Sequence, residues 1–399
     1  WGSGDPYIAG DWVTQGGVTY RCLISHESGT FATDLGLGYW VSELFFKNST
    51  TAGHIGSLWW IHSGVVKIIL PAANGLTTTG MVQDEPDGTT GDLGGTSSYK
   101  DWAEGEFSYY RGFPTTCAFH EGRLYYANTK TSPQKFWGSA SFTYDDFAIG
   151  TGDSDAVNFE IASNEVKAIR WLKSTPKALQ IGTLGGTFSA YGGTAGITST
   201  TINVSDDTSY GSAAILPKKI SSYIYYIQRS LYQIRELVYS YIVDRQVATD
   251  MNDFADHILR DGGGAIDIDH QQSPNDRLWI IRNDGQIAVL TRNAEQQVKG
   301  WCRRIAGTDA KGAGVFEAIC ILQQDQGDDQ IWVIVKRNIN GSVKRYVEYF
   351  SPEFFTDDYD PIRLDCSLSI DNPKTITGAT SAKPVVITST SHGFSNGDQ

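Results

Sequence analysis

The sequence is poor in methionine, cysteine and charged residues, and it has no long hydrophobic run. Its 399 residues include 2 methionines and 5 cysteines, and charged residues make up 19%. The most apolar stretch, residues 55–70, is interrupted by His62 and Lys67, and it is shorter than the ~18–20 apolar residues that a membrane-spanning helix needs. The sequence therefore predicts a soluble protein.

The cysteines and histidines are too scattered for a metal site or a disulfide framework. No two cysteines have the CxxC spacing, and the seven histidines form no HExxH pair. The nucleophile elbow GxSxG, the phosphate loop GxxxxGKS/T and the dinucleotide fingerprint GxGxxG are also missing. We expect buried, unpaired cysteines, no metal, no required cofactor and no enzymatic activity.

Basic residues are outnumbered by acidic ones. The chain has 32 Lys and Arg against 45 Asp and Glu, a formal net charge of −13 at pH 7. A protein that grips nucleic acid does so by neutralising phosphates, which requires the opposite balance. The composition argues against a nucleic-acid clamp.

The residues that are abundant indicate a β-rich fold with many turns. The chain has 43 glycines, and 12% of its residues are aromatic. An apolar strand, a polar turn and a second alternating strand recur six times. The equivalent positions, spaced 45 to 66 residues apart, are Leu58, Leu124, Leu179, Ile224, Leu278 and Trp332.

Most of these hairpins are preceded by another apolar strand, and several are followed by a fourth. Turn residues such as Asn283-Asp284-Gly285 and Leu184-Gly185-Gly186 supply the positive φ that tight hairpins need. Four strands per unit at this spacing are typical of propeller blades. The sequence predicts an all-β protein, a β-propeller of about five to seven four-stranded blades with small flanking β modules, and a β-sandwich is the alternative.

Three segments lie outside this repeat. Residues 1–45 are expected to form a small β module, and residues 83–111 a loop inserted in the propeller region, which spans 46–365. Residues 366–399 read as the start of a C-terminal β module that stops before it closes. We expect the sequence to be a piece of a longer chain.

Two sets of side chains are candidates for a site. Asp267 and Asp269, beside His270, alternate along one strand, and paired carboxylates can hydrolyse glycosidic bonds or bind calcium. Acidic β proteins also collect such pairs in solvated turns, and that interpretation is favoured. Tyr7, Tyr20 and Trp40 could stack on sugar rings, although a small module also uses aromatic residues as its core.

One long stretch resembles a known family. It comprises FHEGRLYYA (119–127), SPQKFWGS (132–139), IASNEVKAIRWL (161–172) and IGTLGGT (181–187). These residues resemble the tail nozzle proteins of short-tailed bacteriophages, also called tail tubular protein B, and the resemblance extends over about residues 50–355. Residues 394–398 are similar to a small β module at the end of such chains, and residues 7–22 with Trp40 are similar to chitin-binding-type modules.

The resemblance implies a structural subunit of the virion tail. Such a subunit forms a homohexamer below the tail adaptor protein, at the distal end of the channel that retains and later ejects the genome. Tail fibres or tailspikes and the host cell envelope are further expected partners, and double-stranded DNA passes without specific binding. An acidic wall would let DNA slide. Two alternatives stay open: a host-surface glycan adhesin using Tyr20 and Trp40, and a polysaccharide hydrolase using Asp267 and Asp269.

Overall fold

The protein is built almost entirely of antiparallel β-sheet, which confirms the predicted all-β class. The computed structural model describes residues 2–15, 18–42, 46–47, 49–50, 52–61, 64–72, 77–84, 102–162, 167–193, 196–309, 312–339, 341–351, 375–390 and 393. Strands account for 50% and helices for 4% of the structure. No helix in these ranges is long and apolar enough to cross a membrane. The chain divides into two compact units, Trp1–Arg260 and Asp261–Gln399.

The first unit begins with a small module of short strands. β1 (Pro6–Tyr7) pairs with β4 (His26–Glu27), and a three-stranded sheet has the order β2-β3-β5, with β2 at Trp12–Gln15, β3 at Val18–Cys22 and β5 at Trp40–Ser42. The helix α1 (Phe31–Gly36) starts after Thr30, whose side chain accepts a hydrogen bond from the Thr33 amide at 3.3 Å.

In the next sheet the strands are not neighbours in chain order, as they would be in a meander. Its order is β8-β7-β6-β9, with β6 at Leu58–Ile61, β7 at Gly64–Pro71, β8 at Thr78–Asp84 and β9 at Trp102–Glu104. β9 lies inside the segment 83–111 that was predicted to be a loop, so that prediction is wrong for these residues. β9 forms because Trp102 stacks on Trp59 of the neighbouring strand at 5.2 Å between ring centroids. Residues 85–101 lie outside the described ranges.

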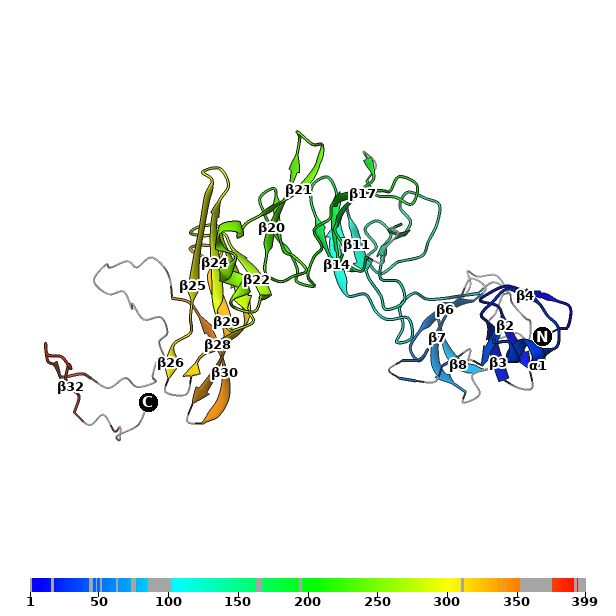
Figure 1. The fold of residues 1–399 in the computed structure, drawn as a ribbon, viewed down its shortest axis with the longest axis horizontal. Helices are drawn as coiled ribbons and strands as arrows, with labels where there is room; N and C mark the ends of the chain where they lie inside the picture. Colours follow the sequence, from blue (N-terminus) through cyan, green and yellow to red (C-terminus); the bar gives the residue numbers. More distant parts are fainter. Residues whose placement is uncertain are drawn as a thin grey trace. The chain divides into compact units, whose positions relative to one another are not determined.

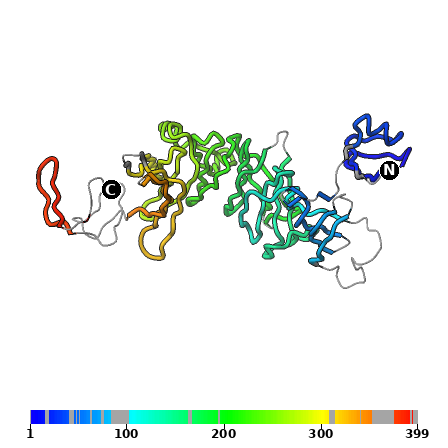
Figure 2. Tube along the Cα trace, turned by 90° about the horizontal axis from the view of Figure 1, so that it is seen from below, coloured from blue at the N-terminus to red at the C-terminus, as the bar shows by residue number. Residues whose placement is uncertain are grey.

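Three four-stranded meanders follow in chain order (Figure 1). Figure 2 shows the same segment as a tube in cyan to green that doubles back between paired strands. The strands are β10 (Thr116–His120), β11 (Arg123–Ala127), β12 (Lys135–Gly138) and β13 (Val157–Glu160); β14 (Ile169–Ser174), β15 (Leu179–Thr183), β16 (Thr187–Tyr191) and β17 (Asn203–Thr208); and β18 (Lys218–Ile220), β19 (Tyr223–Ile227), β20 (Ile234–Ser240) and β21 (Arg245–Asp250). The short helices η2 (Asp253–Ala255) and α2 (His257–Arg260) end the unit.

Local turn chemistry fixes the register of these hairpins. Glu121 and Gly122, between β10 and β11, have φ angles of 47° and 72°, as a two-residue type I′ turn requires. Gly285 has a φ of 79° in the turn predicted from Asn283-Asp284-Gly285. Gly185 and Gly186 are not in the positive-φ region, so the turn chemistry expected for them was wrong.

The meanders of the first unit pack face to face. One buried cluster joins residues from β11 to β13, such as Tyr125 and Phe136, to residues from β14 to β16, such as Leu179 and Ile181. On the other face of the second meander, Trp171 packs with residues of the third, namely Ile224, Tyr226, Leu237 and Ala248. The first strands β10 and β14 lie against each other. The result is a stack of sheets.

The second unit repeats this arrangement. A four-stranded meander contains β22 (Ala265–Gln271), β23 (Arg277–Arg282), β24 (Ile287–Asn293) and β25 (Val298–Arg304), and a three-stranded one contains β28 (Val315–Leu322), β29 (Gln330–Ile339) and β30 (Ser342–Tyr349). A core of ten buried residues, among them Trp279, Phe316 and Val333, lies between the two sheets. Two small hairpins are β26 (Thr308–Asp309) with β27 (Gly312–Ala313), and β31 (Gly378–Ala379) with β32 (Ile387–Thr388).

All six predicted hairpins are pairs of adjacent strands, namely β6/β7, β11/β12, β15/β16, β19/β20, β23/β24 and β29/β30. Of the C-terminal module expected at 366–399, the structure describes only residues 375–390 and 393.

Candidate functional site

The two aspartates predicted as a catalytic pair join two sheets. Asp267 and Asp269 lie on β22, and their carboxylates face β28, the edge strand of the next sheet. Asp269 Oδ2 accepts a hydrogen bond from the Ile321 amide at 2.7 Å, and Asp267 Oδ2 accepts one from the Ile319 amide at 3.4 Å. The alternation along β22 does place both carboxylates on one side, as predicted.

Strand geometry explains why two aspartates on β22 can each bond an amide of β28. Residues two apart on a strand point the same way and are ~7 Å apart, which is also the spacing of successive outward amides on an edge strand. Each carboxylate also accepts its neighbour's amide, from Ile268 at 2.9 Å and His270 at 2.8 Å. The pair therefore connects β22 to β28. We call this contact, in which the carboxylates of Asp267 and Asp269 accept hydrogen bonds from the amides of Ile319 and Ile321, the carboxylate latch.

A second contact of the same kind lies at the end of β22. Asp329, which is 9% exposed, accepts hydrogen bonds from the amides of Gln272 and Ser273 at 2.7 and 3.0 Å. Asp328 accepts one from the Ser273 hydroxyl at 3.1 Å. These two carboxylates therefore hold the turn that follows β22 against the neighbouring sheet.

The remaining acidic pairs have local roles. Asp146 accepts the Ala148 amide at 2.8 Å, and Asp155 accepts the Gly152 amide at 2.8 Å, so both close their own turns. Within the described ranges, no three His, Cys, Asp or Glu side chains are grouped so that they could hold a metal ion.

The aromatic residues of the first module gather in its core. Trp40 is 3% exposed, and it packs edge-on against Tyr7 with ring centroids 5.1 Å apart. Tyr20 is partly buried against Phe31, with centroids 4.7 Å apart. Trp40 thus has no open ring face for a sugar, whereas Tyr7 and Tyr20 are partly exposed. Sugar binding by this module stays a prediction.

The hairpin formed by residues 116–127 contains a buried arginine that the sequence analysis did not single out. Arg123, at the start of β11, is 3% exposed. Its guanidinium donates to the carbonyl oxygens of Ser139 at 2.7 Å and Asp155 at 2.6 Å, and also to those of Asp153 and Ser154. The planar fork of arginine can serve several carbonyls at once. Arg123 therefore fixes the connection between β12 and β13.

The neighbouring residues of this stretch connect two meanders. His120 is 4% exposed, and its Nδ1 lies 2.9 Å from the Ser174 hydroxyl at the end of β14. Glu121 accepts the Ile197 amide at 2.9 Å. Burial lowers the pKa of His120, and the Glu121 charge opposes this effect. The residues His120, Glu121 and Arg123, on either side of the turn, therefore all make contacts that stabilise the fold.

A buried polar network lies within the second meander. Gln180 is fully buried and donates to the Ser189 hydroxyl at 2.8 Å, and Ser189 donates to Asp207 Oδ2 at 2.5 Å. Burial raises the pKa of Asp207 to about 6, against the lowering effect of the Ser189 hydrogen bond.

Asp207 should make the first unit more stable in weak acid. The unfolded carboxyl titrates near ~3.9 and the folded one near 6, so this stabilisation is complete below about pH 4 and is lost as the pH rises through 6. After allowance for solvent screening, we expect the first unit to lose about 1–2 kcal/mol of stability between pH 4 and pH 8 because of Asp207. Asp207→Asn should then melt higher than wild type at pH 8 and gain nothing at pH 4. Thermal unfolding of both proteins from pH 4 to 8 measures this, and a pH-independent difference would contradict it.

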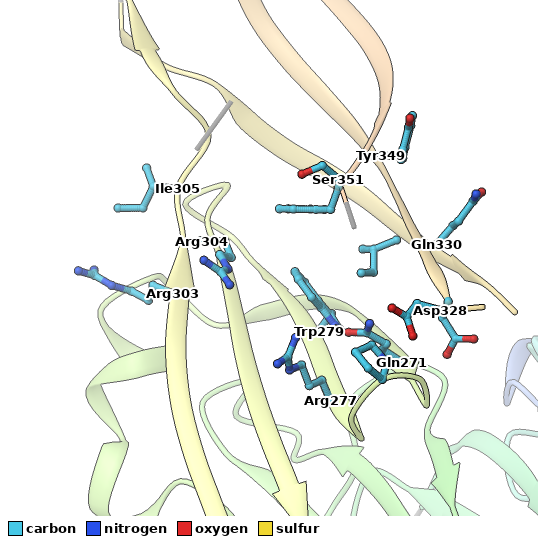
Figure 3. A pocket seen from close by; sticks show the side chains of 14 residues that line it. Gln271, Arg277, Trp279, Arg303, Arg304, Ile305, Asp328, Gln330, Tyr349 and Ser351 are labelled. Atoms are coloured by element: carbon cyan, nitrogen blue, oxygen red, sulfur yellow. Dashed lines mark hydrogen bonds between the residues drawn. The ribbon is translucent and has the colours of Figure 1, made fainter. Parts of the chain in front are cut away.

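The second unit contains a cavity of about 490 Å³ that is lined by residues of both of its meanders. Figure 3 shows Arg303 and Arg304 on one side, Asp328 and Gln330 on the other, and Trp279 between them. The Trp279 ring is 3% exposed, and its Nε1 donates to Gln271 at 3.0 Å. Asp328 is already bonded to the Ser273 hydroxyl, so it is a poor candidate for an acid–base catalyst. The arginines in the lining suit an anionic group better than they suit acid–base chemistry.

Known proteins give little similarity to this chain. No family model and no curated relative matches it. Among solved structures, an auxiliary nutrient binding protein from Bacteroides thetaiotaomicron is 9% identical with a TM-score of 0.34, and the match covers 59% of this chain and 57% of that one. A 6-phosphogluconolactonase-like protein from Bacteroides uniformis is 9% identical with a TM-score of 0.35, over 84% of this chain and 94% of that one. Neither similarity assigns a function or a site to this chain.

Proposed function

We propose that this chain is a structural subunit of the tail nozzle of a short-tailed bacteriophage. The observation that carries the proposal is the resemblance over residues 50–355, whose most specific part is residues 119–187. In a catalytic motif, polar residues point into a cleft. Here Arg123, His120 and Glu121 contact backbone and a hydroxyl of their own fold. This is what a structural protein needs from such a motif.

The stacked meanders support a propeller for the repeated region. Each of four consecutive sheets is an up-and-down meander of four strands, and neighbouring sheets within a unit pack face to face. First strands lie against first strands, as β10 does with β14 and β22 with β28. Radially arranged blades have this arrangement. The repeated region also has the four-stranded sheet β8-β7-β6-β9, which is not a meander, and the three-stranded meander β28-β29-β30. Its described residues thus form six sheets of three or four strands, against the predicted five to seven four-stranded blades.

In this proposal the chain works as a homohexamer with the tail adaptor protein, at the distal end of the virion tail, where the genome is retained and ejected. Tail fibres or tailspikes and the host envelope would be its outer neighbours. Asp267 and Asp269 have a structural role as the carboxylate latch, which weakens the hydrolase alternative. The burial of Trp40 weakens the adhesin alternative. The oligomeric state of the full-length chain with its adaptor tests the proposal: a ring of six subunits is expected, and a persistent monomer or trimer would contradict it.

A further inference from the structure

The hairpin of β20 and β21 ends in apolar side chains that face solvent. In its loop, Tyr241 is 89% exposed, Ile242 is 93% exposed and Val243 is 50% exposed. On the strands beside the loop, Tyr239 and Val247 are also exposed. Single exposed apolar residues are common on protein surfaces, whereas a contiguous group of them indicates an interaction site. We call Tyr241, Ile242 and Val243 the apolar tip.

The hairpin carries this tip beyond its own sheet. β19 stops pairing with β20 at Leu237, whereas β20 and β21 continue for three further residue pairs, as far as Ser240 and Arg245. At ~3.3 Å per residue, the loop lies about 10 Å beyond the last pair with β19. The Tyr239 hydroxyl donates a hydrogen bond to the Asp244 carboxylate and so closes the loop. Figure 1 shows the end of this hairpin above the label β21.

Four other hairpin loops of the protein are polar. The loops between β24 and β25 and between β28 and β29 read AEQQ (294–297) and QQDQGDD (323–329). Those between β18 and β19 and between β22 and β23 read SS (221–222) and QSPND (272–276). Such residues are typical of turns that face water. The apolar tip is therefore suited to an apolar environment instead.

The order of side chains along the hairpin is that of a membrane interface. Ile242 lies in the middle of the loop, with Tyr239 and Tyr241 before it. The charged residues Asp244 and Arg245 come after it, where β21 begins. Elements that lie in such an interface place aliphatic side chains in the lipid, tyrosines at the headgroups and charges in water, and they enter by about 5–10 Å. The reach of the hairpin, about 10 Å, matches this depth.

We propose that the apolar tip inserts into the phospholipid bilayer of the host envelope. The inference rests on the proposed function, which brings the chain to that envelope. Since the chain has a formal net charge of −13, burial of apolar surface, and not attraction to anionic lipid, has to drive the contact. Three side chains make a weak anchor, and the six tips of a ring would bind together with a much higher avidity.

The test is flotation of the full-length protein, alone and with the tail adaptor protein, with phosphatidylcholine vesicles in about 150 mM NaCl. The variant is Tyr241→Ser/Ile242→Ser. The matched control is Phe142→Ser/Phe254→Ser, which removes two aromatic side chains that are 81% and 102% exposed elsewhere. We expect the variant to partition about 10- to 100-fold more weakly than wild type, and the control to behave like wild type. Anionic lipid in the vesicles should weaken the binding of wild type.

Hydrogen–deuterium exchange of wild type locates the contact without any substitution. The amides of residues 241–244 should exchange about 10-fold more slowly when vesicles are added, and those of the polar loop at 294–297 should not change. Protection elsewhere with none at 241–244 would overturn the inference.

Equal flotation of variant and wild type, equal losses in variant and control, or no flotation of wild type would also overturn it. If wild type ignores vesicles and the variant no longer forms a ring, the tip contacts a neighbouring subunit instead of lipid. Native mass spectrometry of the same samples separates this inference from the proposed function. A hexamer that ignores vesicles refutes the membrane contact and leaves the nozzle, whereas tip-dependent flotation of a persistent monomer refutes the nozzle and leaves the contact.

Discussion

Replacement of Arg123 by methionine should destabilise the first unit by about 3–5 kcal/mol. Methionine keeps much of the side-chain volume but donates no hydrogen bond, so the carbonyl oxygens of Ser139, Asp153, Ser154 and Asp155 lose their common donor. A lost hydrogen bond to a charged group costs about 1.5–3 kcal/mol, and buried unpaired carbonyls add to that cost. The connection between β12 and β13 should open first.

Hydrogen–deuterium exchange of the full chain measures this effect residue by residue. Amides in the connection that Arg123 holds should exchange more than 100-fold faster in Arg123→Met, since 1.4 kcal/mol corresponds to a factor of ten in the opening equilibrium. Arg123→Lys is the matched control: it keeps the charge but loses the planar fork, and we expect an intermediate effect. Unchanged exchange in Arg123→Met would show that the guanidinium does not hold this connection.

Removal of both latch carboxylates, as Asp267→Ala/Asp269→Ala, should destabilise the second unit by about 2–4 kcal/mol. The amides of Ile319 and Ile321 then lose the acceptors that the structure gives them. The Asp267→Asn/Asp269→Asn protein keeps one amide oxygen at each position and should lose less than half as much. Thermal or urea unfolding of the second unit compares the two variants.

The same pair of variants distinguishes a latch from a catalytic site. Asparagine cannot act as a nucleophile or a general acid, so a hydrolase would lose its activity in the asparagine variant as fully as in the alanine one. A latch gives a graded loss of stability instead. Release of polysaccharide by wild type that disappears in the asparagine variant would contradict the latch as the role of these residues.

The hairpins could be predicted from the sequence because their information is local. Alternation gives the strands, and a turn residue such as Gly285 gives the reversal between them. β9 could not be predicted in this way. It has three residues, it has no periodic pattern, and its partner β6 lies about 40 residues earlier in the chain.

The roles of polar residues were harder to predict, because they depend on which strand lies next in space. Asp267 and Asp269 have the same alternation whether they face water, a sugar or the amides of β28. The exposure of Trp40 likewise depends on how the small module closes over it.

Native mass spectrometry of the full-length chain, alone and with the tail adaptor protein, tests the proposed function most directly. A nozzle must surround a channel, so we expect a ring of six subunits, formed by the chain alone or on addition of the adaptor. A monomer or trimer that persists with the adaptor present would contradict the nozzle assignment and favour the adhesin.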